Sequence, residues 1–182
     1  GAIVSAKHRS PMETLIDALT NAFRLITSFD GDVTQYAYRS LYIALVSTCI
    51  ASCMAIPFGT WLAEHSFVGK RLLVTVLNTL MGIPTVVVGL VVYSVISRQG
   101  PLGILGLLFT MPGIIIGEVL LILPLMSALT LSAVTRVDRD VRLTALALGA
   151  NERQALLAVF CESRFGILAA VIAGYGRVIG EV

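Results

Sequence analysis

The chain has 182 residues, of which 57% are hydrophobic and only 13% are charged, and its formal net charge is +2. Soluble domains average about 25% charged residues, so this composition excludes an ordinary soluble domain and predicts an integral membrane protein. The small basic excess is scattered around apolar runs rather than gathered in a patch, which argues against a nucleic-acid-binding protein.

The first predicted segment, residues 1–35, contains one amphipathic helix. Residues 1–11 are polar and basic and lack the apolar core of a cleavable signal peptide. From residue 12 to residue 29, apolar side chains recur at helical spacing, which predicts a helix lying in the membrane interface. Residues 30–34 are predicted to form a turn. Because the chain begins without Met and stops at Val182 inside a predicted helix, we expect a fragment of a longer protein.

Residues 36–182 are predicted to form an all-α transmembrane domain, a helical bundle with four spans. The first span covers about residues 40–63, which matches the ~20 residues needed to cross the hydrocarbon. Pro57 predicts a kink near the end of this span. Trp61 predicts an anchor at the interface between membrane and water.

The second predicted span, residues 72–97, carries polar and helix-breaking residues at its centre, namely Asn78, Thr79, Gly82 and Pro84. Proline removes a backbone donor, and such breaks persist where other helices or a water-filled cavity satisfy the freed carbonyls. Asn78 and Thr79 therefore either line a transport pathway or hydrogen-bond to another helix. Residues 98–111 follow with a single charge and are predicted to form a re-entrant or surface segment.

The third and fourth predicted spans, residues 112–134 and 165–182, each contain charged residues. A carboxylate such as Glu118 is costly to bury, so it either faces the bundle interior or water as a functional residue, or it lies near the membrane boundary. Arg177 and Glu181 are four residues apart on one helical face, and they are predicted either to pair with each other in the bundle or to lie at the mouth of a pathway.

Residues 135–164 form a charge-rich loop between the last two spans. Helical spacing continues on both sides of Gly149, which is predicted to end one helix in a left-handed conformation, and Asn151 is predicted to cap the next helix. The loop also holds five arginines and four acids: Arg136, Arg139, Arg142, Arg153, Arg164, Asp138, Asp140, Glu152 and Glu162. Such an amphipathic hairpin is suited to docking onto a partner outside the membrane.

The distribution of Lys and Arg predicts that this hairpin is cytoplasmic. The loop after the third span carries five basic residues and the loop before the second span carries two. The loop between the second and third spans carries one. Basic loops remain on the cytoplasmic side. The N-terminal segment then falls on the outside, although it also contains basic residues, namely Lys7, Arg9, Arg24 and Arg39.

The hairpin resembles the cytoplasmic signature loop of ABC importer permeases, which reads Glu-Ala-Ala, three residues, Gly, nine residues, then Ile-x-Leu-Pro. Ala145 and Gly149 match the second Ala and the Gly of this pattern. The chain departs from it at Leu143 and Thr144 and again over residues 159–162.

Longer stretches resemble the tungstate-type oxyanion permeases. These stretches, LLVTVLNTLMGIPTVVVGLVVYSVISRQGPLGILGLLFT at 72–110 and ALALGANERQALLAVFCESRFGILAAVIAGYGRVIGEV at 145–182, make the likeness more specific than the signature loop alone. The resemblance extends over most of residues 12–182 and suggests tungstate as the imported oxyanion.

This resemblance implies a multi-pass inner-membrane subunit with about five spans when complete. It implies a homodimer that works with two ABC ATPase subunits and an extracytoplasmic substrate-binding protein. The sequence contains no Gly-x-x-x-x-Gly-Lys-Ser/Thr phosphate loop, so ATP and Mg²⁺ are expected on the partner ATPase and no cofactor on this chain. By the motif, contacts with the ATPase fall on Thr144, Ala145, Leu148, Gly149, Ala150, Asn151 and Arg153. Residues predicted from burial cost to line the pathway are Asn78, Thr79 and Glu118.

Other substrates and other classes of protein are alternatives to a tungstate importer. Molybdate, sulfate or phosphate are alternative substrates, and a proton-coupled secondary transporter acting through Glu118 is a different class of protein. An intramembrane hydrolase is disfavoured because His8 and His65 both lie outside the spans, and we expect no catalytic residues. The three cysteines lack His or Asp neighbours and are interpreted as packing residues, with no metal site or disulfide expected: Cys49, Cys53 and Cys161.

Overall fold

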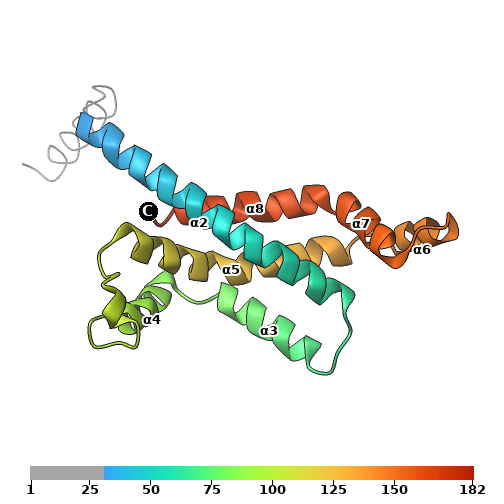
Figure 1. The fold of residues 1–182 in the computed structure, drawn as a ribbon, viewed down its shortest axis with the longest axis horizontal. Coiled ribbons are helices and arrows are strands. Elements are labelled where there is room, and N and C mark those ends of the chain that lie inside the picture. Colours follow the sequence, from blue (N-terminus) through green and yellow to red (C-terminus); the bar gives the residue numbers. More distant parts are fainter. Residues whose placement is uncertain (1–30) are drawn as a thin grey trace, which may run out of the picture. The chain divides into compact units, whose positions relative to one another are not determined.

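The computed structural model describes residues 31–182, and the regular structure of this range is helical (Figure 1). The predicted amphipathic helix at 12–29 lies outside the described residues. The chain divides into two units at residue 40, and the packing below concerns residues 41–182. The elements are α2 (Gly31–Glu64), α3 (Lys70–Met81), α4 (Thr85–Ile96), η1 (Gly103–Leu105), α5 (Met111–Thr135), α6 (Arg139–Ala147), α7 (Glu152–Glu162) and α8 (Arg164–Ile179).

Helix α2 is longer than the predicted first span. It begins at Gly31, so the turn expected at residues 30–34 is wrong over most of its length. No proline interrupts α2 before Pro57. The three cysteines, interpreted above as packing residues, are free and exposed on this chain and do not belong to its buried core.

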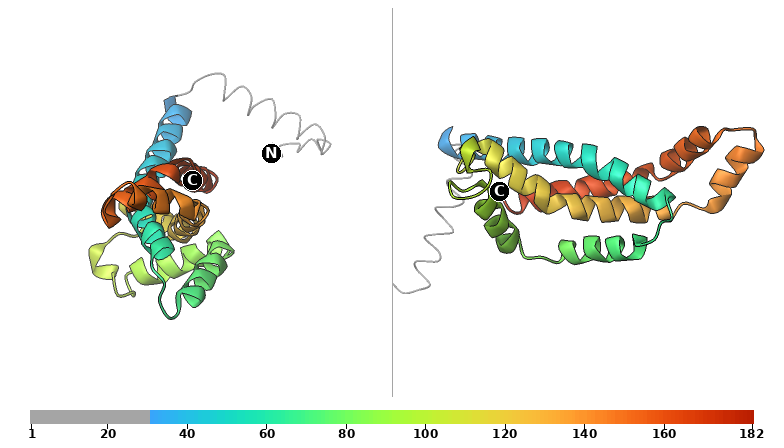
Figure 2. Two further views of the ribbon diagram at one scale, coloured as in Figure 1. Left: turned by 90° about the vertical axis from the view of Figure 1, so that its right-hand side faces the viewer. Right: turned by 60° about the horizontal axis from the view of Figure 1, so that its bottom comes forward.

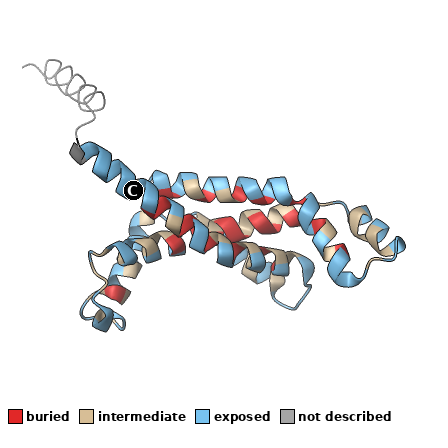
Figure 3. Ribbon diagram, turned by 45° about the horizontal axis from the view of Figure 1, so that its top comes forward, coloured by how far each residue is buried: buried red, intermediate tan, exposed pale blue. Residues whose placement is uncertain are grey.

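The core of residues 41–182 forms where α2 and α8 pack against α5 (Figure 3). Buried small residues of α2 meet larger side chains of α5 and Val178 of α8: Ala44, Ala51, Ala55, Val119, Ile122 and Met126. A Cβ atom built on Gly59 of α2 would lie 2.8 Å from the Ser127 carbonyl oxygen of α5. Small residues thus let the helix backbones approach closely, as is common between membrane helices.

The predicted second span is two helices, α3 and α4, bent by 101°. Gly82 caps α3, and Pro84, which lacks an N–H, precedes α4 in an extended conformation with ψ 137°. Leu77 of α3 packs with Leu62 and Leu131, so α3 lies along α5. The break at this position was predicted, but the size of the bend was not.

Two described helices, α2 and α5, are long and apolar enough to cross a membrane by length and composition. The described residues hold up to four spans if each bent helix pair counts as one. The second pair is α7 and α8, which meet at Ser163 with a bend of 57°. The hairpin α6–α7 lies at the end of the core where α2 connects to α3, while α4 and η1 lie at the opposite end (Figure 2).

Candidate functional site

The turn of the hairpin has the geometry predicted from Gly149. This residue has φ +88°, and its N–H donates to the Leu146 carbonyl at 3.0 Å. The Ala150 N–H donates to the Ala145 carbonyl, also at 3.0 Å. Together these bonds form a Schellman motif, which satisfies carbonyls that the end of α6 would otherwise leave unpaired. Because a Cβ on Gly149 would meet no atom within 4 Å, glycine is favoured here by its backbone conformation and not by lack of space.

Asn151 begins α7 with a capping box. The Gln154 N–H donates to Asn151 Oδ1 at 2.9 Å, and the Asn151 N–H donates to Gln154 Oε1 at 2.8 Å. These reciprocal bonds satisfy two backbone donors at the start of the helix. The predicted cap is therefore present, and its second partner, Gln154, was not predicted.

An ion pair links the two helices of the hairpin. Arg142 of α6 donates to Glu152 of α7 with 2.5 Å between Nη2 and Oε2. Both side chains are substantially exposed, so the pair is screened by water and ions. It joins residues ten apart in the sequence and was missed by the sequence analysis, because opposite charges at that spacing carry no signal until the turn is known.

The residues expected to contact the ATPase lie around this turn. Leu148 has 83% of its surface exposed, an unusual position for a large apolar side chain, and Thr144, Gly149, Asn151 and Arg153 are exposed as well. Ala145 and Ala150 are half-buried. The turn thus presents a hydrogen-bonded backbone and an apolar tip outside the helix core.

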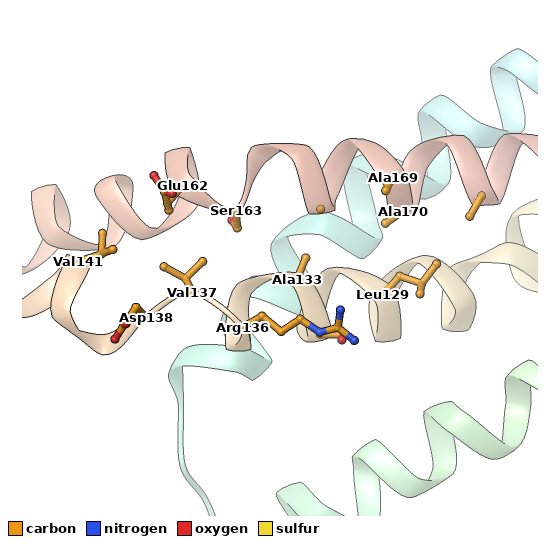
Figure 4. Close-up of a pocket in the computed structure, with 13 residues that line it drawn as sticks. Leu129, Ala133, Arg136, Val137, Asp138, Val141, Glu162, Ser163, Ala169 and Ala170 are labelled. Atoms are coloured by element: carbon orange, nitrogen blue, oxygen red, sulfur yellow. The ribbon is translucent and has the colours of Figure 1, made fainter.

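A cleft of about 670 Å³ lies at the base of the hairpin, between α5 and α8 (Figure 4). Its small side chains come from both helices, and three charged residues, Arg136, Asp138 and Glu162, line it near the hairpin. Sequence reasoning missed this cleft because its walls are about 30 residues apart in the chain and share no motif. The cleft marks where the hairpin joins the spans.

The three residues predicted to line a pathway are not brought together. Glu118 lines a cavity of about 440 Å³ between α4 and α5, with Glu181 also on its wall. Asn78 faces a groove between α3 and α5 that Ser132 also lines, and Ser132 lies about 21 Å along α5 from Glu118 at ~1.5 Å per residue.

Thr79 and Glu118 differ in how their polar atoms are satisfied. The Thr79 hydroxyl is exposed and donates to the Thr75 carbonyl within α3 at 2.9 Å. Glu118 Oε2 is buried and has no hydrogen-bond partner among the described residues. Near it, the predicted Arg177–Glu181 pair is confirmed, with 3.8 Å between Nε and Oε1. A buried carboxylate oxygen without a partner is unusual, so Glu118 is the one of these two residues whose polar group is left unsatisfied.

Comparison with known proteins identifies the family. Residues 55–181 match the model of the binding-protein-dependent transport system inner membrane component. A probable anion ABC transporter permease protein of Haloferax volcanii is 41% identical over 143 residues, which are 79% of this chain and 62% of that relative. The chain thus spans less than two thirds of that relative's length.

Two further relatives are tungstate uptake system permease proteins TupB. The protein of Peptoclostridium acidaminophilum is 34% identical over 171 residues, covering 94% of this chain and 75% of the relative. The protein of Campylobacter jejuni is 30% identical over 171 residues, covering 94% and 72%. The predicted resemblance to tungstate-type permeases is confirmed. The chain belongs to the family of binding-protein-dependent transport system inner membrane components, the multi-pass permease subunits of ABC transporters.

Proposed function

We propose that this chain is the permease subunit of an ATP-driven importer whose substrate is tungstate. Support for tungstate comes from the two relatives named for that ion, which align with 94% of the chain. Permeases named for molybdenum, sulfate and phosphate also match, at lower identity. The broader function, a permease subunit for an anion, is common to these relatives.

The observation that carries the coupling mechanism is the hydrogen-bonded turn at Gly149. Its Schellman motif and the capping box of Asn151 hold α6 and α7 in one arrangement, with Leu148 exposed at the tip. In our proposal residues 144–153 dock into the partner ATPase. Because α7 leads into α8 through Ser163 and a short link joins α5 to α6, movement of the hairpin is transmitted to the spans as a rigid body.

The remaining parts of the importer are supplied by other chains in this proposal. Two copies of the permease form a homodimer, two ABC ATPase subunits bind ATP and Mg²⁺, and an extracytoplasmic binding protein delivers and selects the oxyanion. Asn78, Thr79 and Glu118 line parts of the path through the permease. An ionised Glu118 would repel a divalent oxyanion, so its role is at a gate and not as a substrate ligand.

The proposal is tested in liposomes that contain the permease, its ATPase and its binding protein. The measurement is ATP hydrolysis stimulated by tungstate, compared with molybdate and sulfate. The key variant is Gly149→Asp. Gly69→Asp is the matched control, because Gly69 also has positive φ (+99°) and no atom within 4 Å of a built Cβ, but lies outside the hairpin. We expect Gly149→Asp to lose stimulation while assembling normally, and Gly69→Asp to keep it.

Each other outcome would contradict a specific part of the proposal. Equal loss in both variants would mean that backbone strain, not the hairpin's contact, disables the protein. Full activity of Gly149→Asp would place coupling elsewhere. Stronger stimulation by molybdate or sulfate would show that the proposed substrate is wrong, and it would leave the proposed coupling mechanism unaffected. Uptake without any ATPase would favour secondary transport and make Glu118 the site to examine.

A further inference from the structure

An apolar groove of about 400 Å³ lies between the C-terminal end of α2 and helix α7. Its walls include Pro57 and Trp61 of α2 and Leu157 and Phe160 of α7. These walls are not covered by the rest of the described chain: Trp61 is 47% exposed, Leu157 61% and Phe160 41%. The groove shares one residue, Arg153, with the segment 144–153 that is proposed to dock into the ATPase, and it shares none with the cavity of Glu118.

The groove lies at the level where a predicted membrane span ends. Helix α2 qualifies as a span up to Glu64, and Trp61 sits one turn before that residue. The indole of Trp61 stacks on the His65 ring at 5.3 Å and contacts the Phe67 ring at 5.5 Å between centroids. His65 Nδ1 also lies 3.0 Å from the Trp61 carbonyl oxygen. Such aromatic groups are enriched at the interface between membrane and water.

One face of α7 changes from apolar to basic along its length. Phe160, Leu157 and Arg153 lie at helical spacing and all line the groove. Phe160 is nearest to α8, and Arg153 lies about 10 Å further along α7, away from the core, at ~1.5 Å per residue. The order from Phe160 to Arg153 is thus that of a lipid, with the acyl chain first and the headgroup beyond it.

One basic side chain, Arg153, lines the groove, and no ion pair within the described residues neutralises it. Glu152 is already paired with Arg142. Glu64 is the acidic residue on the groove wall. By sequence, residues 64–71 and 135–164 contain seven basic and five acidic residues: Lys70, Arg71, Arg136, Arg139, Arg142, Arg153, Arg164, Glu64, Asp138, Asp140, Glu152 and Glu162.

We propose that this groove binds one anionic phospholipid. The acyl chain lies against Trp61, Leu157 and Phe160, and the phosphate is held by Arg153. Burial of an acyl chain removes these exposed apolar side chains from water, and a guanidinium is well suited to bind phosphate oxygens in a bidentate manner. The proposal stands on the groove alone and holds whether or not the imported ion is tungstate.

The test uses Trp61, because it is the chain's single tryptophan. The purified chain in detergent micelles is titrated with phosphatidylglycerol that carries brominated acyl chains, which quench a nearby indole on contact. Brominated phosphatidylcholine serves as the zwitterionic comparison. We expect saturating quenching that reaches its midpoint at a lower lipid fraction for phosphatidylglycerol than for phosphatidylcholine.

Two Arg→Gln variants test whether Arg153 binds the phosphate of the lipid. Arg153→Gln is expected to remove the preference for phosphatidylglycerol while leaving the phosphatidylcholine curve unchanged. Arg164→Gln is the control, because Arg164 is also exposed but stacks over Phe165 at 4.9 Å and does not line the groove. Circular dichroism checks that both variants keep their helix content.

Three results would overturn the proposal. Quenching that rises linearly with lipid fraction would indicate general contact with lipid. Equal midpoints for the two lipids, or a preference that survives Arg153→Gln, would remove the role of the anionic headgroup. Loss of the saturating component when the partner ATPase is added would assign the groove to that protein.

Discussion

The helix core and the hairpin both depend on glycine, for opposite physical reasons. In the core, a Cβ on Gly59 would lie 2.8 Å from a carbonyl oxygen of α5, although the backbone there is ordinary helix. In the hairpin, a Cβ on Gly149 would meet nothing within 4 Å, but φ is +88°. The first glycine is needed for close approach, and the second is needed for its backbone angle.

The two regions are therefore held in place by different interactions. The interface of α2, α5 and α8 is stabilised by contact between closely packed backbones and side chains. The hairpin has few buried side chains and relies on local hydrogen bonds and one exposed ion pair. Changes in the core should therefore alter the free energy of unfolding most, and changes in the hairpin should alter coupling with smaller effects on stability.

The largest expected effect is that of Gly59→Ala. The new methyl group overlaps the Ser127 carbonyl oxygen and the Thr130 side chain, which cannot both move aside, so the free energy of unfolding should fall by about 2 kcal/mol. The measurement is unfolding of the chain in mixed micelles with SDS, followed by circular dichroism.

Two other glycines calibrate this prediction. Gly174→Ala should cost less, because its nearest neighbour is the flexible Met126 side chain. Gly176→Ala should leave stability unchanged or slightly higher, because no atom lies within 4 Å and alanine is the better helix former. If all three substitutions have the same effect, close packing is not what distinguishes Gly59.

A smaller effect is expected from Asn151→Ala in the hairpin. Removing the side-chain acceptor leaves the Gln154 N–H without its bond, which costs about 1 kcal/mol of helix stability. Because α7 is peripheral to the core, the loss should appear as faster amide hydrogen exchange in α7 and not in α5. Asn151→Asp retains the acceptor and is the control. Uniform acceleration across both helices would show that the hairpin and core unfold together.

The smallest effect is expected from the Arg142–Glu152 ion pair. A double-mutant cycle with Arg142→Gln and Glu152→Gln should give a coupling energy of about 0.5 kcal/mol, because both side chains are exposed. The coupling should decrease as salt is raised. A coupling that is insensitive to salt would argue that the pair is held away from water, in contrast to its observed exposure.

Local features of the hairpin were predictable because a few neighbouring residues decide them. The left-handed turn follows from Gly149, and the start of α7 follows from Asn151. The cleft at the hairpin base and the Arg142–Glu152 pair were not predictable, because they join residues whose distance depends on the turn itself. Likewise, Pro84 predicts where the break between α3 and α4 falls. It does not specify the bend of 101°, which is found together with packing of α3 on α5.

The sequence by itself determined the membrane class, the helical content and the position of the hairpin, because hydropathy, proline and glycine act over short stretches of chain. Only the tertiary structure decided which helix is central and which side chains share a cavity. Glu118, Asn78 and Thr79 all looked like pathway residues, yet Glu118 lies far along α5 from the groove of Asn78. The physical reason is that side-chain proximity depends on how the helices pack, and the same apolar periodicity permits many packings.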